Sequence, residues 1–203
     1  MQPQALADAA QLIAQHVAAG TRVEQLPERC RPRNRAEGYA VQAEVVQLLG
    51  ERPLGWKIAA TSVAGQKHIN VDGPLAGRLL ANRVFAAGSE AANAIDLRGN
   101  LLRVAEAEFA FRMAHPLPPK ANGQTYAVAE VMAAVDTLHL AIEGPDTRFN
   151  DFVRAGAPSL IADLACASWW VVGSGVSADW RAMDLAAHRV SARSGPQTVA
   201  DGV

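Results

Sequence analysis

The texture of the sequence changes at Pro53, and this change constrains the fold more than any other feature. Before it, residues 6–19 and 35–49 carry apolar side chains at the spacing of an amphipathic helix. A glycine follows each segment directly and Asn34 precedes the second, in the positions where helices commonly end and begin. We therefore predict two helices in an N-terminal helical part, residues 1–52.

After Pro53 the chain consists of short apolar runs separated by glycine, a pattern typical of strands and loops. Two further helices are expected: residues 126–138, capped by Thr125, and a shorter one in residues 158–166. Residues 53–203 are thus predicted to form a β-rich catalytic domain, which gives an α+β fold overall. The expected strands lie within residues 55–60, 75–84, 101–113, 167–172 and 188–192.

Charge and cysteine content exclude several classes of protein. With a net charge of −1 and a pI near 6.5, the chain lacks the basic surface expected of a nucleic-acid-binding protein. The arginines of residues 28–35 lie in a proline-containing loop, which favours an interface over a phosphate-binding track.

Cys30 and Cys166 are far apart in the sequence, which argues against a disulfide or zinc site. No segment has the roughly 20 apolar residues of a membrane span, and we expect a cytoplasmic protein.

Glu106 and Glu108 place two carboxylates inside an otherwise apolar strand pattern. Because side chains two residues apart point to the same face of a strand, the two acids should stand side by side. Two partly buried carboxylates repel each other, and the cost is several kcal/mol unless a cation lies between them. Taken alone, such a pair more often marks a solvated strand edge.

A third acid, Glu143, ends the apolar run of residues 138–142. Three separated acids in apolar settings predict a metal site rather than a solvated edge. Because all three would bind through oxygen, the predicted ion is a hard one, Mg²⁺, Mn²⁺ or Ca²⁺, rather than zinc.

Lys57 lies in an expected strand between Trp56 and Ile58. Lysine is almost never buried without a partner, so Lys57 either faces outward on an edge strand or serves as a proton carrier or carboxylate anchor. Ser62 and Gln66 supply polar groups in the turn that follows. The sequence contains no GxGxxG, GxxxxGK[ST], GxSxG or HExxH motif, which leaves nucleotide binding, serine hydrolysis and zinc proteolysis unsupported.

Six short motifs occur in a fixed order: Gly55-Trp-Lys-Ile-Ala-Ala-Thr-Ser62, Gln66, Val71-Asp-Gly-Pro74, Ala105-Glu-Ala-Glu108, Ile142-Glu143 with Asp146-Thr-Arg148, and Ile161-Ala-Asp163. In this order they resemble the 2-keto-4-pentenoate hydratase family. That family includes 2-oxo-3-hexenedioate decarboxylases and belongs to the fumarylacetoacetate hydrolase superfamily. The resemblance extends from about residue 35 to the end of the sequence.

The resemblance implies a mixed β-sandwich roll of the fumarylacetoacetate hydrolase type with an N-terminal helical part. It also implies a Mg²⁺ or Mn²⁺ site held by Glu106, Glu108 and Glu143. The metal would chelate the carboxylate and 2-oxo groups of the substrate and stabilise an enolate.

The resemblance further implies that Lys57 faces the keto-acid end of the substrate, where it would move protons or hold the carboxylate. Ser62, Gln66 and Cys166 are the other expected substrate-binding residues. The implied activity is a lyase reaction, the addition of water to 2-hydroxypenta-2,4-dienoate or a related 2-oxo-enoate in aromatic catabolism. Decarboxylation of a 2-oxo-enedioate through the same metal enolate is the alternative.

Three features depart from the family pattern. Leu75 stands where many relatives have an aspartate, and Leu164 and Cys166 replace an asparagine and a serine. The sequence also ends before the expected last strands of the roll, which would leave sheet edges exposed. These departures keep a third alternative open: a truncated or diverged non-catalytic subunit that binds a hydratase or decarboxylase partner. The expected assembly is a homo-oligomer.

Overall fold

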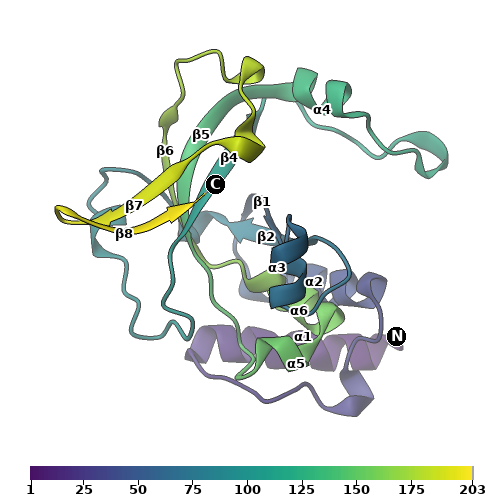
Figure 1. Ribbon diagram of the computed structural model, residues 1–203. Helices are drawn as coiled ribbons and strands as arrows, with labels where there is room; N and C mark the ends of the chain where they lie inside the picture. Colours follow the sequence, from purple (N-terminus) through teal and green to yellow (C-terminus); the bar gives the residue numbers. More distant parts are fainter. Residues whose placement is uncertain (203) are drawn as a thin grey trace.

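The computed structural model describes residues 1–202, so Val203, the last residue of the predicted β-rich domain, lies outside the described residues. A lower body built mainly of helices supports an upper, curved sheet (Figure 1). Helices and sheet are therefore mixed, as an α+β fold requires. The finer prediction, a sandwich roll without its last strands, stays a prediction.

Both predicted N-terminal helices are present. α1 spans Pro3–Ala19, which starts slightly before the predicted segment, and α2 spans Arg35–Leu49, as predicted. The Asn34 side chain accepts a hydrogen bond from the Glu37 backbone N–H, and the glycines that follow the helices have φ of 63° and 65°. The capping residues and glycines of the sequence therefore set these helix ends.

The main hydrophobic core lies between these helices and later segments. α5 (Phe152–Ala155) and α6 (Ala157–Ala162) lie in the same body as α1 and α2 (Figure 1), and apolar residues of α1, α2 and α6 belong to one buried cluster. The buried Gln42 amide donates to Ile161 O at 2.6 Å and to Ala76 O at 3.1 Å. The N-terminal helices thus share a core with residues after position 53, and the division at residue 52 stays a prediction.

The strands form three sheets in the described part of the chain. β1 (Pro53–Ala59) pairs antiparallel with β2 (Leu75–Leu80), and α3 (Val63–His68) lies between them in sequence. The largest sheet contains, in order across it, β3 (Val84–Ala86), β6 (Trp169–Gly175), β5 (Val135–Gly144) and β4 (Glu106–Met113). Its β3–β6 pair is parallel and the others are antiparallel. β7 (Val190–Ser194) and β8 (Gln197–Gly202) form a hairpin.

Short 3-10 turns and one projecting helix complete the fold. α4 (Val128–Ala134) precedes β5 and projects from the upper end of the sheet (Figure 1). The 3-10 turns lie at Glu28–Cys30, Ala81–Arg83, Ala92–Ala94, Ala121–Gly123, Leu164–Cys166, Trp180–Ala182 and Leu185–Ala187. No helix of the described residues is long and apolar enough to cross a membrane.

The prediction of one helix over residues 126–138 is wrong in its second half. The helix ends at Ala134, and Val135 begins β5, which pairs with β4 on one side and β6 on the other. Residues 135–138 pair with β4, and this pairing outweighs a helical spacing that is only a local preference. Thr125 is not the cap either, because the helix begins after Ala127, whose N–H donates to the Glu130 carboxylate.

The strand expected within residues 101–113 begins only at Glu106. Before it, Arg103 has a φ of 51°, and its backbone N–H donates to the Asn100 side chain at 2.6 Å. This asparagine-stabilised turn replaces the first part of the expected strand. It sets the point at which β4 enters the sheet.

Three consecutive residues, Leu164, Ala165 and Cys166, adopt left-handed backbone conformations with φ of 56°, 49° and 64°. The helix predicted over residues 158–166 therefore ends at Ala162 and is followed by a left-handed turn. Gly77 of β2 lies against this turn so closely that an added Cβ would meet Leu164 O at 1.8 Å. Only glycine allows β2 and the left-handed turn to approach in this way.

We expect Gly77→Ala to destabilise the protein by several kcal/mol, because its methyl group would displace the backbone of the left-handed turn. Gly55→Ala in the neighbouring β1 is the matched control, because an added Cβ there meets nothing within 4 Å. Urea unfolding of both variants measures the difference. Equal stability of the two variants would show that the turn moves away from β2 at little cost.

Candidate metal centre

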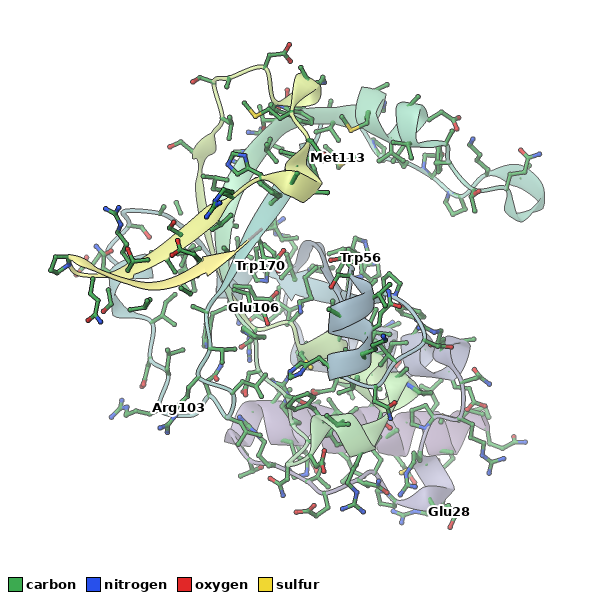
Figure 2. The ribbon with its side chains drawn as sticks, viewed as in Figure 1. Glu28, Trp56, Arg103, Glu106, Met113 and Trp170 are labelled. Atoms are coloured by element: carbon green, nitrogen blue, oxygen red, sulfur yellow. The ribbon has the colours of Figure 1, made fainter. Side chains whose placement is uncertain are left out.

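The three predicted metal ligands lie on one face of the largest sheet because of the register between β4 and β5. Glu106 is the direct partner of Glu143, and Glu108 follows two residues along β4. Directly opposed residues share a face of the sheet, as do residues two apart in one strand. Figure 2 shows Glu106 at one end of β4, with Met113 at the other.

The carboxylates of Glu106, Glu108 and Glu143 each offer one oxygen atom, and these atoms lie within 4.8 Å of one another. Their exposure is graded: Glu106 is exposed, Glu108 is half-buried and Glu143 is completely buried. The cluster is therefore open to solvent from the side of Glu106 and closed behind Glu143.

Lys57 of β1 faces the buried end of this cluster. Its Nζ lies 3.1 Å from Glu143 Oε1, and the lysine side chain is 5% exposed. Neither carboxylate oxygen of Glu143 has a hydrogen-bond partner of suitable geometry among the described residues. A buried carboxylate with one ion-pair contact and no hydrogen bonds retains unused coordination capacity.

Burial raises the pKa of Glu143 to about 7. The positive charge of Lys57 opposes this rise, and the negative charges of Glu106 and Glu108 add to it. Burial also raises the pKa of Glu108, with Lys57 again opposing the change. Both shifts reflect carboxylates that are removed from water by burial, and repulsion among the three acids adds a smaller part.

This arrangement fits a hard divalent cation. The donor set consists of carboxylate oxygens alone, which Mg²⁺, Mn²⁺ and Ca²⁺ prefer. A divalent ion at the cluster would give the Glu143 oxygens a partner and offset the repulsion among the three carboxylates. Glu106, Glu108 and Glu143 are the residues that would hold it.

Cys166 lies in the left-handed turn that Gly77 allows to approach β1 and β2. Burial raises the pKa of the Cys166 thiol to about 12, and the nearby Asp163 charge adds to the rise. Lys57 lowers this pKa, so the thiol is close enough to feel the site's charges. At neutral pH Cys166 therefore presents an uncharged S–H group.

Ser62 and Gln66 are engaged in local structure. The Ser62 hydroxyl caps α3 by accepting a hydrogen bond from Gly65 N at 3.0 Å, and the Gln66 amide donates to Ala60 O at 3.2 Å. Among the described residues, neither forms an ion pair or hydrogen bond with the three glutamates. Their predicted role in substrate binding stays a prediction.

Asp146 and Arg148, which follow Glu143 in the same sequence motif, belong to a larger buried network. Arg148 Nε donates to Asp163 Oδ1 at 2.6 Å, whereas its nearest contact with the Asp146 carboxylate is 3.7 Å. Asp163 also accepts from Thr147 Oγ1 and from the Arg148 backbone N–H, each at 2.7 Å. The Asp146 carboxylate instead accepts from Arg22 Nη2 at 2.7 Å. This network fixes the chain directly after Glu143.

Trp170 of β6 was not predicted as part of the site. It is the register partner of Glu143 and therefore lies on the glutamate face, where Figure 2 shows it near Glu106. Trp170 is 5% exposed, and its Nε1 has no hydrogen-bond partner among the described residues. In the sequence Trp170 is one residue of an apolar run. The strand pairing that brings it to the glutamate face cannot be predicted from such a run.

Comparison with known proteins identifies relatives of one kind. A hydratase of the TodF product from Pseudomonas putida F1 is 34% identical over 140 residues, which are 67% of this chain and 48% of that protein. The 2-keto-4-pentenoate hydratase of Paraburkholderia xenovorans is 30% identical over 177 residues, or 86% of this chain and 62% of the relative. The chain belongs to the 2-keto-4-pentenoate hydratase family. This confirms the prediction from the six motifs.

Two further comparisons complete this result. No family model matches the sequence. The 4-oxalocrotonate decarboxylase of Pseudomonas putida G7, solved with magnesium and adipate, superposes with a TM-score of 0.71 at 21% identity, over 85% of this chain and 64% of the decarboxylase. This likeness shows that the chain shares the fold of the decarboxylase. The chain spans about half to three-fifths of the length of these hydratases.

The pKa of Glu143 predicts how stability depends on pH in the metal-free protein. An unfolded glutamate has a pKa of 4.5, against about 7 in the fold, so unfolding releases a proton between these values. The free energy of unfolding should therefore fall by roughly 2 kcal/mol as pH rises from 4.5 to 7, and change little above 7. Urea unfolding in the presence of a chelator measures this.

The matched control is the double variant Lys57→Met, Glu143→Gln, which removes both buried charges together and leaves neither one unpaired. Its unfolding free energy should vary less with pH in this window. A pH dependence unchanged from that of the wild type would show that another group causes it.

Proposed function

We propose that this chain is a divalent-metal-dependent hydro-lyase that adds water to 2-hydroxypenta-2,4-dienoate or a related 2-oxo-enoate. The observation that carries the proposal is the buried Glu143 carboxylate, which lies opposite Glu106 in the sheet and has no hydrogen-bond partner in the described chain. The names of the hydratase relatives support the reaction class. The metal would be Mg²⁺ or Mn²⁺, held by Glu106, Glu108 and Glu143.

When bound, such a metal supplies Lewis-acid stabilisation of the negative charge that develops on a 2-oxo acid as it becomes an enolate. The protein must then move protons to and from the carbon skeleton. Lys57 would do so, and the burial of its ammonium group beside Glu143, 3.1 Å from the carboxylate, supports this role. The Lys57–Glu143 contact also orients Nζ toward the glutamate face of the sheet.

Cys166 would contribute polarity without charge. A thiol whose pKa is about 12 stays protonated at neutral pH, so it serves as a weak hydrogen-bond donor and not as a base. In this proposal Lys57 transfers protons and Cys166 contacts the substrate. Ser62 and Gln66 remain proposed substrate-binding residues through the turn that follows β1.

The second candidate is decarboxylation of a 2-oxo-enedioate. The structural similarity to a 4-oxalocrotonate decarboxylase favours it, and the same glutamates and lysine would serve both reactions. Only decarboxylation releases carbon dioxide, so mass analysis of the products separates the two. Absence of any turnover by a metal-bound chain would instead favour the third candidate, a diverged partner subunit.

The assembly is proposed to be a homo-oligomer. The sheet face opposite the glutamates carries exposed apolar side chains, among them Phe111, Leu140 and Ile142 with exposures of 46%, 57% and 54%. Exposed apolar surface of this kind is commonly covered by another protein chain. We also propose a cytoplasmic location and action on a small 2-oxo acid.

Metal titration tests the proposed site. We expect Mg²⁺ or Mn²⁺ to bind and raise the thermal unfolding temperature of the wild-type chain, because the ion binds only the folded cluster. Glu106→Gln should weaken binding by about tenfold or more through loss of a charged ligand. Glu90→Gln removes an exposed carboxylate outside the cluster and should leave metal affinity unchanged.

Turnover of the dienoate, followed by its loss of absorbance, tests the proposed role of Lys57. Lys57→Met should retain metal binding and reduce turnover by about 100-fold or more, because it removes the proton carrier and not a metal ligand. A wild-type chain that binds no metal, or a Glu106→Gln variant with unchanged turnover, would contradict the proposed function.

A further inference from the structure

A cavity of about 140 Å³ lies away from the glutamate cluster, where the end of α1 meets the ends of β3, β5 and β6. Trp170 of β6 lies on the same face of the sheet as Glu143, its register partner. Trp169, which lines the cavity, is adjacent to Trp170 in the strand and therefore points to the opposite face. The cavity is therefore separated from the proposed metal centre by the sheet itself. Three arginines line it: Arg22, Arg83 and Arg148.

Two of these arginines are already neutralised by carboxylates. Arg22 Nη2 contacts both Asp146 oxygens, at 2.9 and 2.7 Å, and Arg148 Nε contacts Asp163 at 2.6 Å. The remaining carboxylate in the cavity wall, Asp96, is paired with an exposed arginine outside it. These pairs leave no carboxylate of the cavity free for Arg83.

Arg83 is in fact without an ion pair among the described residues, although it is half-buried. Its single hydrogen bond joins Nη1 to Ser168 Oγ at 3.3 Å, and its guanidinium lies 5.1 Å from the Trp169 ring centroid. The remaining N–H groups of Arg83 reach solvent, since none of its atoms is both buried and unpaired. The wall of the cavity therefore presents a planar, positively charged donor group that has no carboxylate within 4.0 Å among the described residues.

We propose that this cavity binds a small organic carboxylate through Arg83. A guanidinium matches the two oxygens of a carboxylate in one plane, and one negative charge balances the single unpaired arginine. The ring of Trp169 and the side chain of Val17 provide apolar contacts for the rest of a short carbon chain. Asp96 and Asp146 repel a doubly charged phosphate more strongly than a carboxylate, which favours the carboxylate.

Burial and the positive charge of Arg148 both lower the pKa of Arg83, and the negative charges of Asp146, Asp163 and Glu51 only partly oppose this. The negative charge of a bound anion would offset both effects and raise the pKa of Arg83. Anion binding and the charged form of Arg83 would therefore stabilise each other. Asn100 supports the wall of the site by donating to Pro145 O at 2.9 Å, and the backbone N–H of Leu101 donates to Asp146 at 2.8 Å. These contacts hold the loop and the Arg22–Asp146 pair in place before any ligand binds.

The test uses the metal-free, ¹⁵N-labelled 203-residue chain, titrated separately with sodium pyruvate, sodium phosphate and sodium chloride at constant ionic strength. We expect pyruvate to shift the amide signals of Ser168 and Trp169 saturably. Arg83→Gln should weaken this binding by about tenfold or more, the effect of losing a charge-assisted hydrogen bond. Chelation of metal keeps this outcome independent of the proposed hydratase function.

Arg193→Gln is the matched control, because it removes the same charge from the exposed β7–β8 hairpin and should leave pyruvate affinity unchanged. Arg83→Lys keeps the charge but loses the planar fork, so its affinity should lie between those of the wild type and Arg83→Gln. The proposal is overturned if pyruvate causes no saturable shift at Ser168 and Trp169. It is also overturned if phosphate binds as tightly as pyruvate, or if Arg193→Gln weakens binding as much as Arg83→Gln.

Discussion

The complete burial of the Glu143 carboxylate is the constraint on which the rest of the site depends. A carboxylate removed from water costs several kcal/mol unless a cation or several donors replace the lost hydration. Among the described residues, Lys57 is the cation within 4.0 Å of it, and Lys57 is itself buried. The two charges come from different sheets, so β1 must stay close to β5. Gly77 lets β2 lie against the left-handed turn at residues 164–166. This contact holds β1 and β2 against the main hydrophobic core, and so keeps β1 close to β5.

The segment that follows Glu143 connects two charged regions on opposite sides of the sheet. Glu143 faces the other glutamates, while Asp146 and Arg148, a few residues later, line the arginine cavity. Between them, Thr147 is completely buried and bonded to Asp163. Because these groups are paired and enclosed, the segment has little freedom to move. The position of the Glu143 carboxylate is therefore fixed from behind by an ion-pair network that is separate from the glutamate cluster.

The sequence predicts local features of this fold better than long-range ones. Asn34 and the glycines after α1 and α2 define helix ends because capping depends on adjacent residues. The shared face of Glu106 and Glu108 follows from strand periodicity, but the closeness of Glu143 depends on the β4–β5 register, which no local pattern gives. Trp170 was missed for the same reason. Residues 135–138 have helical spacing and are nevertheless strand, because pairing with β4 overrides a local preference.

The departures from the family pattern are related to one another in the structure. Leu75 begins β2, Leu164 begins the left-handed turn, and both are 1% exposed members of the main hydrophobic core. An aspartate and an asparagine would each need polar partners in such a place. Two leucines together need none, so each substitution suits the apolar surroundings that the other creates. Compared with the expected family pattern, the same pair lacks a carboxylate and an amide in the neighbourhood of Cys166. Acid–base chemistry at this site would then fall to Lys57, the ionisable group that the fold buries beside Glu143.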